Sequence, residues 1–541
     1  MSRSFYILVL FFLVKCQANK NEKRNVTSPN WNNEVIYHVM QRSFFDSNGD
    51  RHGDLNGFVQ KLDYLKELGV TTILFTPLYE SSFYHNYFPT DYKKIDQEYG
   101  TFDDYIHFIE EVHKNDMKFI MDMETQYAAS GHIWFDSSYN NPSSKFSEFI
   151  YYADSLNLKP EQIFMKSGSP LHDFKAWPGN SHHIVLLDLN NESVKNWTSE
   201  FYQFWVDPNG DGNFTDGVDG FRIDHIMDDL DYKGIFTNMY HSFWKPVFNS
   251  CKSINPSIFI LGEQSNWDDF GDKMVVNSNA DAAFNFKLRF AITGAESVKD
   301  MYFKEDHKFQ IFTPSLVHDV ALKTEKICVD SIHMVNFLEN HDIDRWASVV
   351  NDKRLLKIGA LLNLFLPGIP SIFYGQELGL TGKKHEWGYD VNHIPIREAF
   401  PWTSNENDEG NALWYKGDEE WWNESFWKTS KIDLLSLEYQ KKDSTSLWNF
   451  YKKLIKIRHT FPALRIGSYH PVMEKSTQIM AFDRKLNEHS IFVIMNIGKE
   501  KVTIPFSIED NTSLIMEKIN FRNDSIEISP FGFMVSNRKN S

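Results

Sequence analysis

Three acidic side chains each follow a short apolar run, and carboxyl groups in such positions can perform nucleophilic and acid–base chemistry. Asp224 ends the segment Gly-Phe-Arg-Ile-Asp, Glu263 ends Ile-Leu-Gly-Glu, and Asp342 ends Asn-Phe-Leu-Glu-Asn-His-Asp. Two carboxyl groups that flank a glycosidic bond are what its hydrolysis requires, because one attacks while the other protonates the leaving oxygen. Any one of these acids could be a solvated loop residue, but three in equivalent positions favour a shared site.

Two other segments place oxygen-bearing side chains on alternate residues of a tight loop, as calcium-binding loops do. The first has this series: Asp46, Asn48, Asp50, His52 and Asp54. We predict that it binds Ca²⁺. The second segment, 207–213, begins like an EF-hand loop but has Val218 where the bidentate Glu of that loop would stand. Whether this second segment binds a metal is left open.

Strand ends can bring distant acids together only if the strands lie side by side. Apolar runs alternate with amphipathic stretches such as 57–68 and 102–114, which indicates parallel strands joined by helices. The candidate strands are 35–39, 70–76, 118–123, 217–223, 258–262, 282–286, 333–338 and 371–374. Eight strands favour an α/β fold of the (β/α)8 TIM-barrel type, in which the C-terminal strand ends form one active-site face. Periodicity alone leaves an open doubly wound sheet as an alternative.

Two regions depart from this rhythm. Residues 128–189 lack clear periodicity and predict a subdomain inserted after the third strand, which divides the barrel into 30–127 and 190–460. The C-terminal region, 461–541, predicts an antiparallel β domain of the β-sandwich type. Its short candidate strands are 478–482, 490–495, 502–506 and 531–535.

Composition excludes some classes of partner. The 541 residues are 42% hydrophobic, which suits a folded protein with a large core. The net charge of −17 argues against nucleic acid as a partner, because phosphate binding needs clustered cations. The aromatic content of 15% could serve sugar stacking or a core equally well. Beyond the N-terminal segment, Cys251 and Cys328 could pair or remain free.

The N-terminus has the pattern of an export signal. Arg3 precedes the apolar run 5–14, which is shorter than the ~20 residues that a membrane-spanning helix needs. We expect residues 1–18 to be a cleaved signal peptide and the protein to be secreted or periplasmic. A lipid anchor at Cys16 is the alternative, although Lys15 fits a lipidation box poorly. No later stretch is apolar enough to predict a transmembrane segment.

Taken together, these segments resemble the α-amylase superfamily, glycoside hydrolase family 13. The stretches GFRID, GE and ENHD match three short signature regions in the family's order. Further matches lie at 36–58, 186–190, 368–379 and 394–402, so the resemblance covers nearly the whole chain after the leader. The last of them is similar to secreted amylases close to the oligo-1,6-glucosidase branch.

The resemblance implies roles for single residues. Asp224 takes the position of the nucleophile, Glu263 that of the acid/base, and Asp342 that of a third carboxylate that binds sugar hydroxyls. The charge of Arg222 would keep Asp224 ionised, whereas Glu263 needs a drier site to stay protonated. Tyr87 falls on the family's sugar-stacking tyrosine and His341 on a hydrogen-bond donor to the sugar. In the calcium loop, the family uses the backbone carbonyl at the position of His52.

The chain also departs from the family pattern in its sugar-reading residues. Tyr127 stands where the family has a histidine that touches the sugar, and Gln126 replaces an Asn that often binds a second calcium. Phe88 replaces an Asp that helps exo-acting glucosidases to hold a terminal glucose. An aromatic ring there extends a stacking wall, so we expect Phe88 and Tyr127 to favour long glucans over maltose.

The sequence therefore predicts a secreted retaining α-glycosidase that hydrolyses starch-type glucans or malto-oligosaccharides. One alternative is an α-glucosidase or transglycosylase that acts on small oligosaccharides. Another is a glucan-binding or non-catalytic amylase-like protein. Nothing in the sequence separates hydrolysis from transglycosylation.

Overall fold

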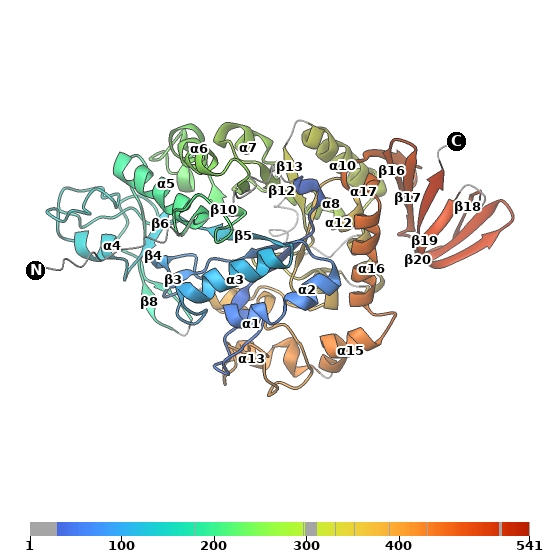
Figure 1. Cartoon of the computed structure of the whole chain (residues 1–541), viewed down its shortest axis with the longest axis horizontal. Coiled ribbons are helices and arrows are strands. Elements are labelled where there is room, and N and C mark those ends of the chain that lie inside the picture. Colours follow the sequence, from blue (N-terminus) through green and yellow to red (C-terminus); the bar gives the residue numbers. More distant parts are fainter. Residues whose placement is uncertain are drawn as a thin grey trace, which may run out of the picture.

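The central part of the chain is a closed barrel of eight parallel strands (Figure 1). The computed structural model describes residues 30–539 except 178, 296, 298–310, 330–331, 351, 389, 430 and 508–510. Around the barrel the strand order is β1-β14-β13-β12-β11-β10-β5-β2, and β1 closes it by pairing with both β14 and β2. The strands are β1 (Ile36–Val39), β2 (Thr72–Phe75), β5 (Lys118–Met123), β10 (Gly220–Ile226), β11 (Phe259–Gln264), β12 (Ala282–Phe284), β13 (His333–Asn336) and β14 (Ile369–Phe373). The barrel prediction and all eight candidate strands are confirmed, and the open sheet is excluded.

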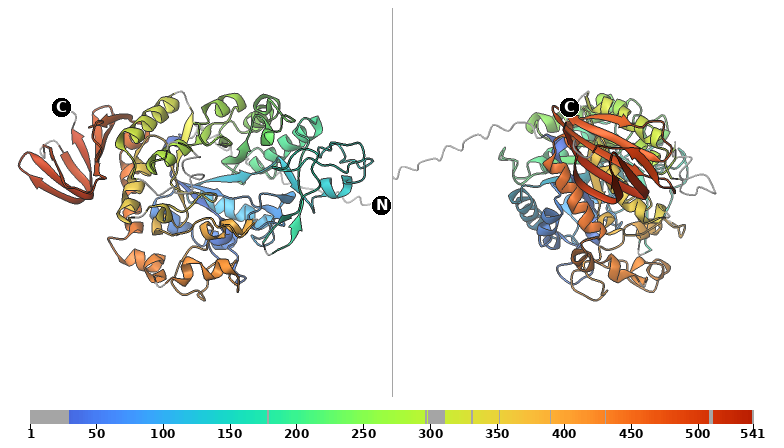
Figure 2. Two further views of the ribbon diagram at one scale, coloured as in Figure 1. Left: turned by 180° about the vertical axis from the view of Figure 1, so that it is seen from behind. Right: turned by 90° about the vertical axis from the view of Figure 1, so that its right-hand side faces the viewer.

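Helices between the strands cover the outside of the barrel (Figures 1 and 2). The longer ones are α3 (Phe102–Lys114), α5 (Glu192–Val206), α6 (Lys245–Ile254), α10 (Pro314–Val329), α12 (Arg354–Phe365) and α16 (Leu447–Thr460). Shorter ones are α1 (Leu55–Val59), α2 (Leu62–Leu68), α4 (Ile133–Ser138), α7 (Asp272–Ser278), α8 (Phe286–Ile292), α11 (Trp346–Val349), α13 (Glu420–Asn423), α14 (Ile432–Leu435), α15 (Leu437–Lys442) and α17 (Ala463–Ile466). In the part of the chain that is described, no helix is long and apolar enough to cross a membrane. The predicted signal peptide and Cys16 lie outside the described residues.

Helix α3 illustrates how local sequence sets these elements. Thr101 caps its N-terminus and forms a reciprocal capping box with Asp104, which satisfies backbone N–H groups that would otherwise lack partners. Its apolar side chains recur at helical spacing and are buried: Tyr105, Phe108, Ile109 and Val112. The exposed face carries the charged residues, so the helix can pack on the barrel by one face only.

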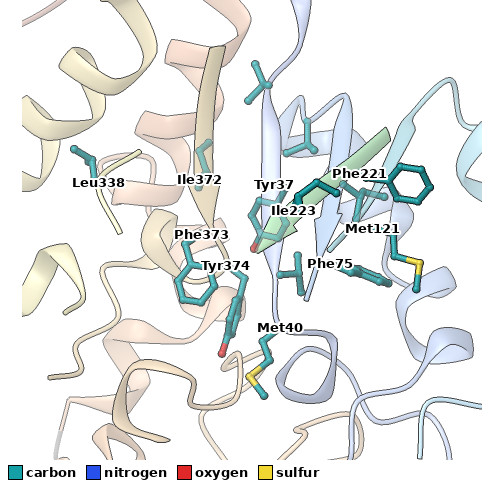
Figure 3. Packing of buried hydrophobic residues seen from close by; sticks show 14 of the residues in the cluster. Tyr37, Met40, Phe75, Met121, Phe221, Ile223, Leu338, Ile372, Phe373 and Tyr374 are labelled. Atoms are coloured by element: carbon teal, nitrogen blue, oxygen red, sulfur yellow. The ribbon is translucent and has the colours of Figure 1, made fainter. Parts of the chain in front are cut away.

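Alternation along the strands separates two sets of buried side chains. One apolar cluster takes a residue from each of seven barrel strands, so it must fill the barrel interior: Ile36, Leu74, Ile120, Leu261, Ala282, Val335 and Ile369. Residues one position out of phase, such as Tyr37, Phe75, Met121 and Phe221, belong to the larger cluster outside the strands (Figure 3). On each strand, the side chain two residues after one of these interior residues points the same way. It therefore enters the C-terminal mouth of the barrel.

The irregular insertion follows β5 and lies at the opposite end of the molecule from the C-terminal sheet (Figures 1 and 2). It holds together through β6 (Tyr127–Ala129) paired with β9 (Ile184–Leu186), helix α4, and the short pair β7 (Phe174–Lys175) and β8 (Ser181–His182). A second excursion, β3 (Tyr79–Ser81) and β4 (Pro89–Ile95), follows β2 and was not predicted.

The C-terminal region is an antiparallel domain, as predicted, but its strands form one hydrogen-bonded sheet. The order is β15-β16-β17-β20-β18, with β19 paired to β20. Its strands are β15 (Ser468–Val472), β16 (Ile479–Leu486), β17 (His489–Asn496), β18 (Val502–Pro505), β19 (Asn511–Arg522) and β20 (Ser525–Lys539). The long strand β20 pairs with β17, β18 and β19 and so joins all six strands. The sandwich arrangement stays a prediction. Residues of β16, β17, β18 and β20 share one apolar cluster, which gives this domain its own core.

Both cysteines in the described part of the chain are free thiols. Cys251 is buried in α6 and Cys328 is partly buried in α10. The question that the sequence left open is thus answered in favour of unpaired residues.

Candidate active site

Four functional side chains follow the interior-facing register of three adjacent strands. Asp122 lies two residues after Ile120 on β5, and Glu263 lies two residues after Leu261 on β11. Between them, β10 carries Arg222 and Asp224 on alternate positions, and Arg222 is in register with Asp122. Because side chains alternate between the two faces of a strand, all four groups point into the barrel near its C-terminal end.

Arg222 joins these carboxylates. Its side chain is 1% exposed, and its Nη1 donates to Asp122 Oδ1 at 2.9 Å and to Asp224 Oδ1 at 2.7 Å. Its Nη2 donates to Glu263 Oε2. A buried guanidinium is costly to desolvate unless paired, and here its fixed fork of donors reaches three acids at once.

Asp224 is held in its charged form. Burial raises the pKa of Asp224, but the positive charges of His225 and Arg222 outweigh it and leave that pKa below its usual range. His225 Nδ1 lies 3.2 Å from Asp224 Oδ2. The backbone of His225 has φ of 44°, in the left-handed region, which turns its ring into the mouth of the barrel beside the carboxylate. An ionised carboxylate in this position can act as a nucleophile.

Glu263 has the opposite property. Burial raises the pKa of Glu263 to about 7, although Arg222 and His225 oppose this shift. Its Oε1 is buried and has no hydrogen-bond partner. A carboxyl group with a pKa near neutrality can be protonated and donate that proton, so the environments of Asp224 and Glu263 separate their roles.

The two carboxyl groups are close together. One ligand atom each from Asp224, His225 and Glu263 all lie within 4.8 Å of one another, the one such trio of acidic or histidine residues in the described part of the chain. Retaining glycosidases keep their carboxyls about 5–5.5 Å apart, whereas inverting enzymes need about 6.5–9.5 Å to admit a water molecule. The spacing therefore suits direct attack by a carboxylate.

Asp342 and His341 lie in the loop after β13, and Arg397, from the segment after β14, reaches Asp342. His341 Nε2 lies 2.9 Å from Asp342 Oδ2, and Arg397 Nη2 donates to Asp342 Oδ1 at 3.1 Å. Burial raises the pKa of Asp342, but His341 and Arg397 outweigh it and hold the pKa well below its usual range. Asp342 is thus a charged acceptor whose side chain remains 27% exposed to the cavity.

Aromatic side chains line the cavity above these charges. The ring of Tyr87 stacks on His341 at 5.3 Å, and its hydroxyl donates to Asp122 Oδ2 at 2.6 Å. Phe88 meets Tyr127 edge-on at 6.2 Å between ring centroids. These rings and the acids border a cavity of about 560 Å³, which also includes Trp267, Lys384 and His393. Its apolar walls and few charged groups suit a ligand with apolar faces and many hydroxyls.

The family model for the alpha-amylase catalytic domain matches residues 38–467, which include this cavity and all three carboxylates. The chain belongs to the alpha-amylase family. It is accordingly a glycoside hydrolase, and the predicted family resemblance is confirmed.

Individual alpha-amylase family members show how far the similarity extends. Over 520 residues the chain is 29% identical to "Alpha-amylase 3" of Dictyoglomus thermophilum, which covers 94% of this chain and 93% of that protein. It is 28% identical to "Probable oligo-1,6-glucosidase 3" of Bacillus subtilis, over 86% and 90% of the two chains. The solved structure of Eubacterium rectale Amy13B has a TM-score of 0.74 at 24% identity, covering 94% of this chain and 96% of that one, and shares the fold.

The structure gathers the predicted catalytic and sugar-binding residues but places the predicted metal ligands elsewhere. The set that borders the cavity or contacts its carboxylates is Tyr87, Phe88, Tyr127, Arg222, Asp224, Glu263, His341 and Asp342. The loop of Asp46, Asn48, Asp50, His52 and Asp54 precedes α1 and contributes nothing to the cavity. Tyr127 differs from expectation in one respect, because its hydroxyl donates to Asp231 at 3.0 Å. The aromatic ring of Tyr127, rather than its hydroxyl, therefore faces the cavity.

Three functional side chains were not chosen from the sequence. Asp122 was assigned no role from the sequence, although it accepts from both Arg222 and Tyr87. His225 directly follows Asp224, so adjacency could have revealed it. Arg397 lies 55 residues after Asp342, and only the fold brings the two together.

The two pKa shifts predict a bell-shaped pH profile for an alpha-amylase family enzyme. If Asp224 attacks as a carboxylate and Glu263 donates a proton, activity should be lost as pH rises through about 7 and, at the other end, only at pH values below the usual range for Asp. His225→Asn, which tolerates a positive φ, removes a positive charge from Asp224 and should move the acidic limb upward. The measurement is kcat/KM against pH for both proteins. A wild-type profile that stays flat through neutral pH would contradict the role of Glu263 as the proton donor.

Proposed function

We propose that this enzyme hydrolyses α-glucosidic bonds in starch-type glucans or malto-oligosaccharides with retention of configuration. The observation that carries the proposal is the close approach of Asp224 and Glu263, whose surroundings lower the pKa of the first and raise that of the second to about 7. Two carboxyls with opposed environments at this separation fit double displacement.

In the first step, Asp224 forms a bond to the anomeric carbon as the glycosidic C–O bond breaks. Glu263 gives its proton to the departing oxygen, which leaves as a neutral hydroxyl. In the second step, the Glu263 carboxylate takes a proton from water, whose oxygen displaces Asp224 from the anomeric carbon. Two inversions restore the α configuration and return both carboxyls to their starting states. If a sugar hydroxyl replaces water, the same steps yield transglycosylation.

The remaining residues of the cavity would hold and distort the sugar. Asp342 and His341 present an acceptor and a ring nitrogen to neighbouring hydroxyls, and Arg397 fixes the carboxylate of Asp342. Tyr87 is anchored by Asp122 and by the nearby His341, so its ring offers an immobilised stacking surface for a pyranose. Hydroxyl contacts that strengthen as the ring flattens would lower the barrier.

Phe88 leads us to expect preference for longer glucans. Its ring packs against Phe83 at 5.1 Å and faces the cavity edge-on to Tyr127, so it offers apolar surface and no polar group to a terminal hydroxyl. The kcat/KM on maltoheptaose should exceed that on maltose, and early products should include oligosaccharides. Phe88→Asp should shift this ratio towards maltose, with Phe164→Asp, an exposed ring at the rim, as a matched control. Equal efficiency on maltose, with glucose as the sole early product, would overturn the expectation.

The loop from Asp46 to Asp54 has a donor set that fits Ca²⁺. Three carboxylates, one amide oxygen and one backbone carbonyl are all hard oxygen ligands. Asp46 accepts N–H groups of Asn48 at 3.0 Å and Gly49 at 2.7 Å, and Asp54 caps α1 through Gly57 at 2.7 Å. The backbone of the loop thus folds around the side chains of Asp46 and Asp54. A bound ion would stiffen the segment that leads into α1. The proposed export signal at 1–18 is consistent with this, because extracellular calcium sites work at roughly 0.1–1 mM.

Removing calcium should lower the melting temperature. Binding to the folded state stabilises it by mass action, so a chelator should reverse the gain. Asp50→Ala removes a side chain that is 44% exposed, and it should abolish most of that response without disturbing the core. Melting curves with calcium and with EDTA test this. Unchanged melting, with no metal found by elemental analysis, would show that the loop is only a turn.

A further inference from the structure

A second loop lies in the connection between α5 and β10, the strand that carries Arg222 and Asp224. Its residues 207–216 read Asp-Pro-Asn-Gly-Asp-Gly-Asn-Phe-Thr-Asp. Oxygen-bearing side chains occupy the first, third, fifth and seventh positions, as in an EF-hand loop, but the twelfth position is Val218. The pattern therefore lacks the ligand that normally completes such a site.

Asp216, at the tenth position, is placed to supply the missing carboxylate. Only 7% of the residue is exposed, and its Oδ1 is buried without a hydrogen-bond partner. Asp207 Oδ1, at the other end of the loop, is also buried without a partner. Unsatisfied carboxylate oxygens are costly to bury, so two of them in one loop point to a cation that would satisfy both.

The acids of this loop have no direct ionic partner among the described residues, although His113 lies near enough to act on Asp216. Within the described residues, none of Asp207, Asp211 and Asp216 forms an ion pair, whereas Asp219, just beyond, lies 2.9 Å from His113. Asp207 and Asp211 both lie near enough to Asp216 to act on it electrostatically. The three acids therefore share one small region, in which a divalent cation would remove their repulsion.

The backbone winds round the same side chains. Asp207 Oδ2 accepts the N–H of Gly212 at 2.9 Å, and Asp211 Oδ1 accepts that of Asn213 at 2.7 Å. Gly210 and Gly212 have φ of 70° and 76°, a conformation that glycine adopts without strain. Asn209 Oδ1 accepts the N–H of Asp211 at 2.8 Å, so the side-chain oxygens face the inside of the loop.

We propose that residues 207–216 form a calcium site whose ligands are Asp207, Asn209, Asp211, Asp216 and the backbone carbonyl of Asn213. The acids of this loop are not all within 4.8 Å of one another, so binding would contract it. The contraction would act on the N-terminal end of β10, opposite the active-site face, because Val218 N–H donates to Trp205 O at 3.0 Å and ties the end of the loop to α5. The ion would thus fix the start of the strand that holds Asp224.

The test counts calcium in the full-length protein rather than activity. Wild type, Asp211→Ala, Asp50→Ala and the double variant are treated with EDTA, dialysed against about 1 mM calcium and analysed for bound metal. Asp211 is exposed, so its loss should leave the fold intact. We expect Asp211→Ala to bind one calcium fewer than wild type whatever Asp50→Ala does, because the two loops are separate.

Two further variants sharpen this result. Asp216→Asn keeps the shape of the side chain but removes its charge, and it should also lose one calcium together with the calcium-dependent rise in melting temperature. Glu200→Gln, an exposed acid on α5 just before the loop, should leave the metal content unchanged. The proposal is overturned if Asp211→Ala and Asp216→Asn both bind as much calcium as wild type.

Discussion

Asp224→Ala and Glu263→Gln are each expected to lower kcat by at least about 10²–10⁴-fold, because each removes a covalent or proton-transfer step. Glu263→Gln retains a polar side chain of the same size but has no proton to give. KM should change little in comparison, since the aromatic wall and the Asp342 cluster remain. The measurement is steady-state kinetics on maltoheptaose. Glu200→Gln serves as the control and should have wild-type rates.

The choice of substrate separates the two roles. A glucoside whose leaving group departs without protonation needs Asp224 but not the acid function of Glu263. Glu263→Gln should therefore form the glycosyl-enzyme from that substrate at a rate close to wild type, while Asp224→Ala remains inactive. Activity of either variant close to wild type on a glucan would refute the assignment.

Loss of Arg222 is expected to have the second largest effect. Arg222→Gln leaves buried carboxylates without their shared cation, and breaking buried ion pairs of this kind costs about 3–5 kcal/mol of unfolding free energy. The Arg222 charge also opposes the rise in the pKa of Glu263, so its removal should move the basic limb of the pH profile upward. Chemical denaturation and kcat/KM against pH measure the two effects.

Matched variants distinguish this role from general damage. Arg222→Lys keeps the charge but not the fork of donors. The basic limb of its pH profile should therefore stay close to that of wild type, while its free energy of unfolding should fall. Arg354→Gln removes an arginine that is 47% exposed and paired with Asp352, and it should cost at most ~1 kcal/mol. Wild-type stability and an unmoved basic limb in Arg222→Gln would contradict the proposed network.

The barrel could be predicted from sequence because its determinants are local. Each strand is a short apolar run, and the acids at the ends of β10, β11 and β13 could be identified without knowing what they contact. The strand period of two then fixes which side chains enter the barrel, as Ile120 and Asp122 show on β5. Sequence reasoning succeeded where a single strand both carries a site residue and sets the direction of its side chain.

Features that depend on long-range contacts were not predictable. The strand order of the C-terminal sheet depends on β20 pairing with three strands, and β15 and β19 lack the continuous apolar runs that mark the other strands. Arg397 reaches Asp342 only through the folded chain. Gln126, noted only as a departure from the family, donates to the carbonyl of Asp224 at 3.2 Å and to Glu124 at 3.1 Å. It therefore supports the backbone of the proposed nucleophile, which no pattern in the sequence indicated.

The anomeric form of the first product tests the retaining mechanism most directly. Proton NMR during early hydrolysis of maltoheptaose, before mutarotation equilibrates the sugar, distinguishes the α-anomer from the β-anomer. The proximity of Asp224 to Glu263 predicts that the α-anomer accumulates first and that the β-anomer appears later by mutarotation. Initial release of the β-anomer would show that water attacks the substrate directly, and it would contradict a covalent role for Asp224.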